Sequence, residues 1–352
     1  MRKLITTFIL IFPFFLSSQE TLFTLVDNSK TGINFSNELV DTKEHSIFLY
    51  ANYYGGAGVG IGDFDNDGLE DIFFAANLLD DKIYKNLGNF EFEDKTKMSG
   101  IINNGSWSTG VTVADVNNDG LLDIYVSCEL YDDAPVLRRN KLYINQGSFK
   151  FKESASEWRV DVDRRTRHSV FFDYNKDGLL DLYLLNHPPN TGNFSPFFGK
   201  DMSLPEYNLQ LFENKGNHFV DVTQSAGLSR SGFPNAAVIG DFNKDGWPDI
   251  YVANDFDSPD FLYFNNKDKT FTYATETSLR HTSFYSMGVD AADINNDSHL
   301  DLMVLDMTAE DNFRLKSNMS GMNPDSFWKV VNDGGHYLSL IHISEPTRRR
   351  GI

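Results

Sequence analysis

The chain alternates between short apolar runs and acidic loops. Ahead of one such loop, Val111 and Val113 are separated by a polar residue, and the apolar run from Ile124 to Val126 follows the loop. The last loop is flanked in the same way, by Val289 and Ala291 before it and by Leu302 and Val304 after it. Alternation of apolar and polar positions predicts half-buried strands, so each loop is expected to join two strands.

This strand, loop and strand unit recurs five times. The copies read GDFDNDGLEDIFF from Gly62, ADVNNDGLLDIYV from Ala114, FDYNKDGLLDLYL from Phe172, GDFNKDGWPDIYV from Gly240 and ADINNDSHLDLMV from Ala292. Their first aspartates follow one another at steps of 52, 58, 68 and 52 residues. Recurrence at this spacing indicates a repeat architecture with one blade-sized unit per copy.

A second element recurs downstream of the loops, in which an aromatic residue and an Asn precede a turn and a Phe. It reads YKNLGNFEF from Tyr84, YINQGSFKF from Tyr143, FENKGNHF from Phe212 and YFNNKDKTF from Tyr263. Asn and Gly supply the positive φ angles of tight hairpins. Two hairpins per repeat make four strands, so we predict an all-β fold, a β-propeller of four-stranded antiparallel blades with about five to six blades in residues 19–338.

Composition supports strands and limits the partners. Aromatic residues make up 14% of the chain, and they suit pleated, half-buried surfaces. The net charge of −19 opposes binding to nucleic acid and to anionic membranes, and it favours cations. We therefore expect no nucleic-acid partner.

The N-terminus has the pattern of a secretory signal peptide. Arg2 and Lys3 precede an apolar run from Leu4 to Leu16, and Ser17 and Ser18 follow. We predict a signal peptide at 1–18 and a secreted protein that is periplasmic, on the outer surface or extracellular. No later stretch approaches the roughly 20 apolar residues of a membrane helix, so no transmembrane segment is expected.

The only cysteine of the chain is Cys128. It lies inside an apolar run, which predicts a small buried hydrophobic residue rather than a reactive thiol. A lipoprotein anchor needs a cysteine at the end of the signal peptide, and the sequence has none there.

The repeated loops have the chemistry of calcium sites, with oxygen-bearing side chains at positions 1, 3, 5 and 9 and a turn at position 6 that can direct the carbonyl of position 7 inward. Calcium takes about six to eight oxygen ligands in flexible geometry. We predict about five Ca²⁺ sites. Their ligands are Asp63, Asp65, Asp67, Leu69 and Asp71 in loop 1; Asp115, Asn117, Asp119, Leu121 and Asp123 in loop 2; Asp173, Asn175, Asp177, Leu179 and Asp181 in loop 3; Asp241, Asn243, Asp245, Trp247 and Asp249 in loop 4; and Asp293, Asn295, Asp297, His299 and Asp301 in loop 5, the seventh-position residue binding through its carbonyl.

Three other interpretations of these loops are an EF-hand, an RTX-type loop and a simple turn. An EF-hand needs a Glu at position 12, which is apolar in all five copies, and RTX-type loops recur every nine residues. The third is that Asp-Asn-Asp-Gly only makes a turn. A turn alone has no need for acids at positions 1, 5 and 9 together, and these acids repel one another without a counter-ion, so calcium is favoured.

The loops are expected to differ in affinity. Loop 1 has four carboxylates where the others have three and an Asn, which predicts the tightest binding there. In loop 5, Ser298 replaces the turn glycine and costs about 1–2 kcal/mol if it takes a left-handed conformation. We predict that loop 5 binds most weakly.

Several segments of the chain resemble a known protein family. The chain resembles the FG-GAP/VCBS-repeat proteins with an integrin-α-type propeller, and within them the exported bacterial CRTAC/UnbV-like group. The residues that carry it are GVGIGDFDNDGLEDIFF from Gly58, FENKGNHFVDVTQSAGL from Phe212 and LDMTAEDNFRLKSNMSGMNPDSFWKVVNDGGHY from Leu305. The resemblance implies a seven-bladed propeller with Ca²⁺ in the blade loops, often structural, and ligand recognition elsewhere on the surface. It also implies a further C-terminal ASPIC/UnbV domain, which this sequence does not contain.

The end of the chain departs from the repeat. No hairpin of the aromatic-Asn type follows Asp293, so the fifth repeat is unfinished and the propeller is not expected to close. The segment 339–352, SLIHISEPTRRRGI, carries three consecutive arginines in an acidic protein. It resembles translated sequencing-adaptor read-through, and we expect it to be an artefactual tail on a truncated gene.

For function, the sequence favours a monomeric surface module that binds an extracellular protein or glycan ligand, as in cell adhesion. The alternative is an extracellular polysaccharide-processing enzyme or its accessory subunit, since carboxylate pairs also serve glycoside hydrolysis. The acids are repeated and look committed to metal, and no G-x-S-x-G motif occurs, so we expect no catalytic residues.

Other segments could carry recognition. Arg159, Arg164, Arg165 and Arg167 could bind anions, although interleaved acids favour a solvated strand face. The insertions at 187–207 and 129–140 could shape a binding face or only cap the propeller. Within the longer insertion, Phe194, Phe197 and Phe198 are expected to pack on the propeller rather than stack on a ligand.

Overall fold

The computed structural model describes residues 23–50, 52–188, 206–256 and 258–307, together with 313, 328, 331, 332, 336, 338, 339 and 343–346. The signal peptide predicted at 1–18 lies outside the described residues. So do the three phenylalanines of the longer insertion, Phe194, Phe197 and Phe198. The expectations for these segments stay predictions.

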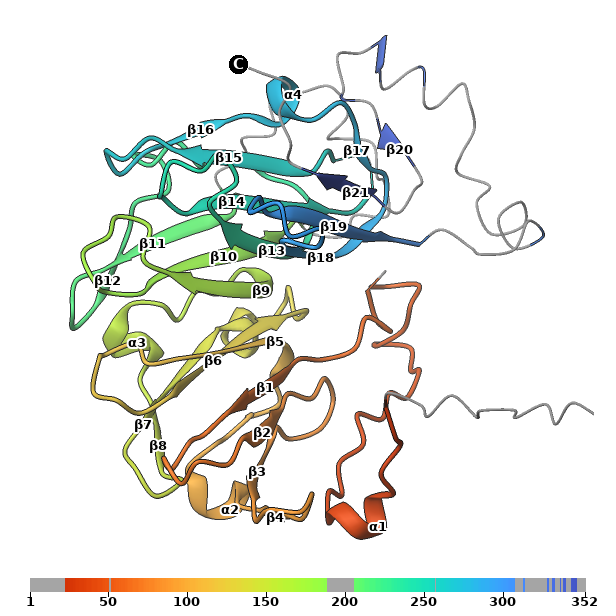
Figure 1. Cartoon of the computed structure of the whole chain (residues 1–352). Coiled ribbons are helices and arrows are strands. Elements are labelled where there is room, and N and C mark those ends of the chain that lie inside the picture. Colours follow the sequence, from red (N-terminus) through yellow and green to blue (C-terminus); the bar gives the residue numbers. More distant parts are fainter. Residues whose placement is uncertain are drawn as a thin grey trace, which may run out of the picture.

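Four antiparallel sheets of four strands each stand side by side in the molecule (Figure 1). In every sheet the strands follow chain order, and an acidic loop joins the first strand to the second. The strands are β1 (Val59–Gly62), β2 (Asp71–Phe74), β3 (Lys82–Asn86) and β4 (Phe92–Asp94) in blade 1; β5 (Trp107–Ala114), β6 (Asp123–Glu129), β7 (Lys141–Asn145) and β8 (Phe151–Glu153) in blade 2; β9 (Arg165–Phe172), β10 (Asp181–His187), β11 (Gln210–Asn214) and β12 (Phe219–Asp221) in blade 3; and β13 (Pro234–Gly240), β14 (Asp249–Asn254), β15 (Phe261–Asn265) and β16 (Phe271–Tyr273) in blade 4. The predicted all-β fold with four-stranded blades is confirmed.

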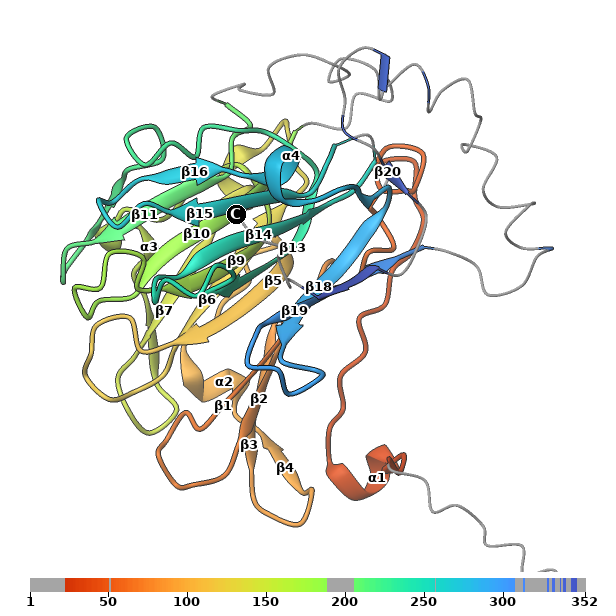
Figure 2. The same cartoon turned by 45° about the horizontal axis from the view of Figure 1, so that its top comes forward.

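The fifth sheet is incomplete. Its first two strands, β18 (Ser286–Ala292) and β19 (Asp301–Asp306), flank the fifth acidic loop as predicted. The third strand is β21 (Ile343–Pro346), from the anomalous segment 339–352, which pairs with β19. A short parallel pair, β17 (Thr282–Ser283) with β20 (Leu338–Ser339), lies beside it. Among the described strands the sheets form an open fan and not a closed ring (Figure 2).

Helices are few and short. In residues 23–307, as far as the structure describes them, three one-turn helices follow the last strands of blades 1, 2 and 4, and one precedes the first blade. They are α2 (Thr96–Ser99), α3 (Ala155–Trp158), α4 (Thr275–Ser278) and α1 (Asn28–Thr31), with a 3₁₀ turn, η1 (Pro135–Arg138), between β6 and β7. No helix in the described part of the chain is long and apolar enough to cross a membrane.

The first strands of successive sheets lie next to one another at the inner side of the fan. Each of β5, β9, β13 and β18 contains a register shift of the β-bulge kind near its start. Bulges increase local twist and redirect side chains. In β5, Gly110 permits close approach of the next blade, because a Cβ there would lie 2.8 Å from Nδ1 of His168.

The hydrophobic core is divided between the blades. One apolar cluster fills the space between blades 1 and 2, and three similar clusters fill the spaces between the later pairs. Cys128 is fully buried in the first of these clusters, and burial raises the pKa of its thiol to about 11. The prediction that Cys128 is a small buried hydrophobic residue is confirmed.

The segment before blade 1 covers the end of the blades opposite the acidic loops. Tyr50 and Tyr53 pack against Trp107. The Tyr50 hydroxyl donates a hydrogen bond to Glu129 at the end of β6. This end is therefore closed by aromatic packing, whereas the acidic loops remain at the other end.

Candidate metal centres and a polar pocket

The first aspartate of each loop organises the loop backbone. Asp63 accepts hydrogen bonds from the amides of Asp67, at 3.0 Å, and Gly68, at 2.7 Å. The first aspartates of the other four loops accept the same two bonds. The sixth residue has positive φ in all five loops, as predicted, and Ser298 takes it at φ 65°. The fourth residue also has positive φ, which the sequence analysis did not anticipate; these residues are Asn66, Asn118, Lys176, Lys244 and Asn296.

The ninth aspartate of each loop is buried and its position is fixed. Asp71 accepts hydrogen bonds from the amides of Phe64, at 2.9 Å, and Asn86, at 2.8 Å. Asp123, Asp181 and Asp249 accept the equivalent pair. In loop 5, Asp301 accepts the first of these bonds, and its other oxygen has no partner among the described residues, which include no hairpin of the aromatic-Asn type in this blade.

Burial raises the pKa of the ninth aspartates of loops 1 to 4, and the other acids of the same loop add to the effect. The pKa of Asp71 and of Asp249 is raised to about 6, and that of Asp123 and of Asp181 to about 7. In loop 1, carboxylate oxygens of Asp63, Asp65 and Asp71 all lie within 4.8 Å of one another. A buried carboxylate beside other carboxylates favours a cation, and an all-oxygen donor set fits a hard one such as calcium.

The structure therefore brings together the side chains predicted at positions 1, 3 and 9 of loop 1. Asp67, at position 5, turns toward a lysine: Lys85 of β3 contacts Asp65 and lies 2.7 Å from Asp67. These contacts raise the pKa of Lys85 well above its ordinary value. The seventh-position carbonyls stay predicted ligands.

The hairpin asparagines have a role that the sequence analysis missed. Asn145 donates one hydrogen bond to Leu122 in its own loop, at 3.0 Å, and another to Phe64 in the preceding blade, at 2.9 Å. Asn214 and Asn265 make the same link to the blade before them. Positive φ falls on later turn residues such as Gly88 and Asn89. These asparagines therefore connect blades through their side-chain NH₂ and support the turn through their side-chain oxygen, which accepts from the amide two residues on. Their recurrence at one position of the repeat was the available signal.

The acidic loops are also connected to each other. The side-chain amide of Asn66 donates a hydrogen bond to the carbonyl of Gly120 in loop 2, at 3.0 Å, and the side-chain amide of Asn118 donates one to the carbonyl of Gly178 in loop 3, at 3.2 Å. Lys176 of loop 3 donates to Gly246 of loop 4. The fourth residue of one loop thus contacts the sixth residue of the next.

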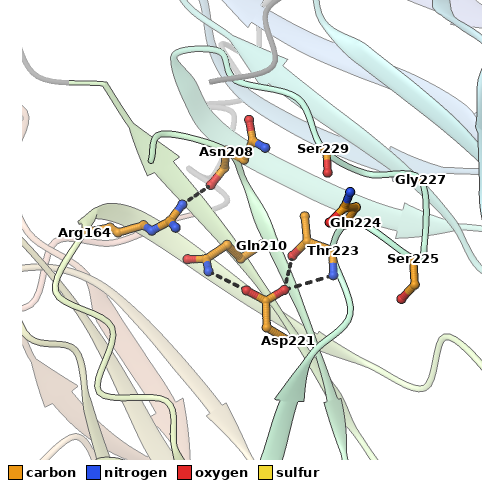
Figure 3. Close-up of a pocket in the computed structure, with 9 residues that line it drawn as sticks. All are labelled: Arg164, Asn208, Gln210, Asp221, Thr223, Gln224, Ser225, Gly227 and Ser229. Atoms are coloured by element: carbon orange, nitrogen blue, oxygen red, sulfur yellow. Dashed lines mark hydrogen bonds between the residues drawn. The ribbon is translucent and has the colours of Figure 1, made fainter. Parts of the chain in front are cut away.

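A polar pocket of about 850 Å³ opens beside blade 3 (Figure 3). Gln210 donates to Asp221 at 2.9 Å, and Asp221 also accepts from the hydroxyl of Thr223 at 2.6 Å. The guanidinium of Arg164 lies 3.4 Å from the carbonyl of Asn208, and burial lowers its pKa. The pocket is lined by Arg164, Asn208, Gln210, Asp221, Thr223, Gln224, Ser225, Gly227 and Ser229.

A second pocket of about 410 Å³ shares Arg164 and adds Glu206 and Tyr207 from the end of the longer insertion. Near it, Arg165 pairs with Asp132, and Arg167 lies 3.6 Å from the buried Glu129. The side chains of Arg165 and Arg167 are only 10% and 14% exposed. The interpretation of these arginines as a solvated strand face is therefore wrong for these two, because each has a carboxylate partner from β6 or the loop after it. Arg159 lies apart, at the end of α3.

Fold and loops together define an all-β protein of propeller-type blades with one acidic loop per blade. Residues 42–126, 202–252 and 241–304, more than half of the chain, match the FG-GAP-like repeat family. The chain belongs to this family, which confirms the resemblance found in the sequence.

Two curated relatives are similar over part of the chain. Cartilage acidic protein 1 of Xenopus tropicalis is 25% identical over 164 residues, which cover 46% of this chain and 24% of that protein. The Homo sapiens cartilage acidic protein 1 is 23% identical over 205 residues, or 58% of this chain and 29% of that protein. The chain thus spans less than a third of the length of these relatives.

Among solved structures, the biofilm matrix protein Bap1 of V. cholerae superposes with a TM-score of 0.31 at 14% identity, over 63% of this chain and 30% of that one. A GH43 β-1,3-galactosidase superposes with a TM-score of 0.38 at 10% identity, over 71% of this chain and 85% of that one.

Proposed function

We propose that this chain is an exported, calcium-loaded recognition module of the adhesion type, whose blades form a scaffold and whose polar pocket beside blade 3 binds a glycan. The observation that carries the proposal is the contrast between the two kinds of site. The acidic loops repeat with nearly the same hydrogen bonds in the described blades, whereas the polar pocket lies beside a single blade, blade 3.

Calcium suits the scaffold role. The ninth aspartates of loops 1 to 4 are buried and each accepts hydrogen bonds from two backbone amides, so they have no freedom to bind and release a substrate. Ligands that repel one another assemble around a cation, and the binding free energy then contributes to folding. We expect the blades to lose stability when calcium is removed.

A glycan suits the pocket. Its lining offers amide, hydroxyl, carboxylate and guanidinium groups, which match the hydroxyls of a sugar, and Tyr207 of the adjoining pocket supplies a ring face. An apolar peptide anchor finds few apolar partners in the same lining. A protein ligand is the second possibility, and an enzyme acting on polysaccharide is the third.

A glycan and protein array tests the proposal, with thermal unfolding followed in parallel, each in calcium and in chelator. Ser229→Trp fills the pocket mouth, and Ser156→Trp, on the exposed side of α3, is the matched control. We expect glycan binding that needs calcium, that Ser229→Trp abolishes and that the control retains.

Three results would overturn parts of the proposal. If the chain binds proteins and no glycan, the pocket has a protein ligand. If hydrolysis products appear in the same assay, the chain is an enzyme. If the melting temperature is the same in calcium and in chelator, calcium does not stabilise the blades.

A further inference from the structure

Lys85 is held inside loop 1 by its own blade and by the next one. It lies in β3, one residue before the hairpin Asn86, and its ammonium group contacts Asp65 and lies 2.7 Å from Asp67. The ring of Phe149, from the hairpin of blade 2, lies 5.5 Å from the same nitrogen. The side chain is only 22% exposed, so the lysine is part of the loop and not a surface charge near it.

The corresponding strand residue differs in every complete blade, and among these blades the lysine occurs where the third residue of the loop is Asp and not Asn. The pairs of loop residue and strand residue are Asp65 with Lys85, Asn117 with Ile144, Asn175 with Glu213, and Asn243 with Phe264. In loop 3, Glu213 accepts a hydrogen bond from Asn175 at 3.1 Å, so the strand residue reaches the loop there too. The extra carboxylate of loop 1 thus comes with an extra positive charge.

We propose that Lys85 is a tethered cation that competes with calcium in loop 1 and cancels the affinity that the fourth carboxylate would add. The inference rests on the proposed calcium binding of the loops. It removes the advantage of loop 1 that the carboxylate count predicts, since Lys85 brings the net charge of the four carboxylates to that of the three in loop 2. Even in water-like surroundings, a unit positive charge about 5 Å from a bound divalent ion lowers the affinity of the site for that ion by about tenfold.

Each of these loops carries one glycine at position 6, which provides a site-resolved measurement. The amides of Gly68, Gly120, Gly178 and Gly246 each donate to the first aspartate of their loop, so their NMR signals report calcium in loops 1 to 4 separately. Calcium is titrated into chelator-treated protein. We expect the midpoint of Gly68 close to that of Gly120, whereas four carboxylates without Lys85 would place it at about tenfold lower calcium.

Three variants identify the lysine as the cause. Lys85→Met should shift the Gly68 midpoint to about tenfold lower calcium and leave the other glycines unchanged, and Lys85→Arg, which keeps the charge, should leave Gly68 near its wild-type midpoint. Lys82→Met is the matched control, because Lys82 lies on the same strand and pairs with Asp94 outside the loop, at 2.9 Å. It should shift no glycine.

The double variant Asp65→Asn with Lys85→Ile gives loop 1 the residue pair of loop 2, and its Gly68 midpoint should approach that of Gly120. If Lys85→Met does not fold, the wild type still decides the point, since a Gly68 midpoint about tenfold below that of Gly120 would show that Lys85 does not compete with calcium. Equal Gly68 midpoints in the wild type and in Lys85→Met would refute the tethered cation and leave calcium binding intact. If no glycine responds to calcium in any protein, the proposed calcium binding itself fails, and this inference fails with it.

Discussion

Asn145→Ala should destabilise the molecule more than any equivalent change in blade 1. Asn145 is 1% exposed and makes three hydrogen bonds, to Phe64 and Leu122 through its amide and from Gly147 to its carbonyl oxygen. One buried bond is worth about 1 kcal/mol, and an orphaned buried carbonyl costs about 1–3 kcal/mol. The expected loss in free energy of unfolding is about 3–5 kcal/mol.

Asn86 provides the matched control within the same chain. It holds the equivalent position of blade 1 and bonds to Glu70 at 2.8 Å and from Gly88 at 2.9 Å, both within its own blade. Asn86→Ala should therefore cost about 1–2 kcal/mol. The difference between the two variants measures the bond between blades.

Urea unfolding in saturating calcium measures both losses from the shift in midpoint at a common slope. Asn214→Ala and Asn265→Ala extend the series, because both asparagines also bond to the preceding blade, at 3.0 Å and 2.8 Å. These two should group with Asn145→Ala. If all four variants lose the same stability, the link between blades contributes nothing and the reasoning is wrong.

Two further predictions concern single positions. Ser298→Gly should stabilise the fold by about 1 kcal/mol, because Ser298 has φ 65°, and should strengthen calcium binding in loop 5. Ser148→Gly is the control: Ser148 also has positive φ but lies in a hairpin, so this variant should stabilise the fold without changing calcium affinity. Calorimetry measures stability and calcium affinity separately. Burial raises the pKa of Asp260 to about 7, so between about pH 4 and pH 7 the folded protein keeps a proton that the unfolded chain has lost, and its stability falls as pH rises. Asp260→Asn should remove this contribution, so its melting temperature relative to wild type should be higher at pH 7.5 than at pH 4.5, both in saturating calcium; a difference that does not change with pH contradicts the assignment.

The repeat was predictable because its signals are local. Alternating apolar positions, the acids at positions 1, 5 and 9 and the glycine at position 6 all act within about a dozen residues, through strand pairing, turn geometry and charge repulsion. The strands around each loop and the turn at position 6 were predicted on these grounds. The burial of Cys128 followed from its apolar neighbours.

The rest depends on contacts between residues far apart in the chain. Asn145 reaches Phe64 across 81 residues, and Arg167 meets Glu129 only because β9 packs beside β6. Lys85 enters loop 1 from another strand, which no spacing within the loop indicates. The sequence by itself determined the blade and its acidic loop, since both arise from neighbouring residues. The tertiary structure decided how the blades are connected and which charges reach each loop, because these contacts arise only when separate strands and blades pack together.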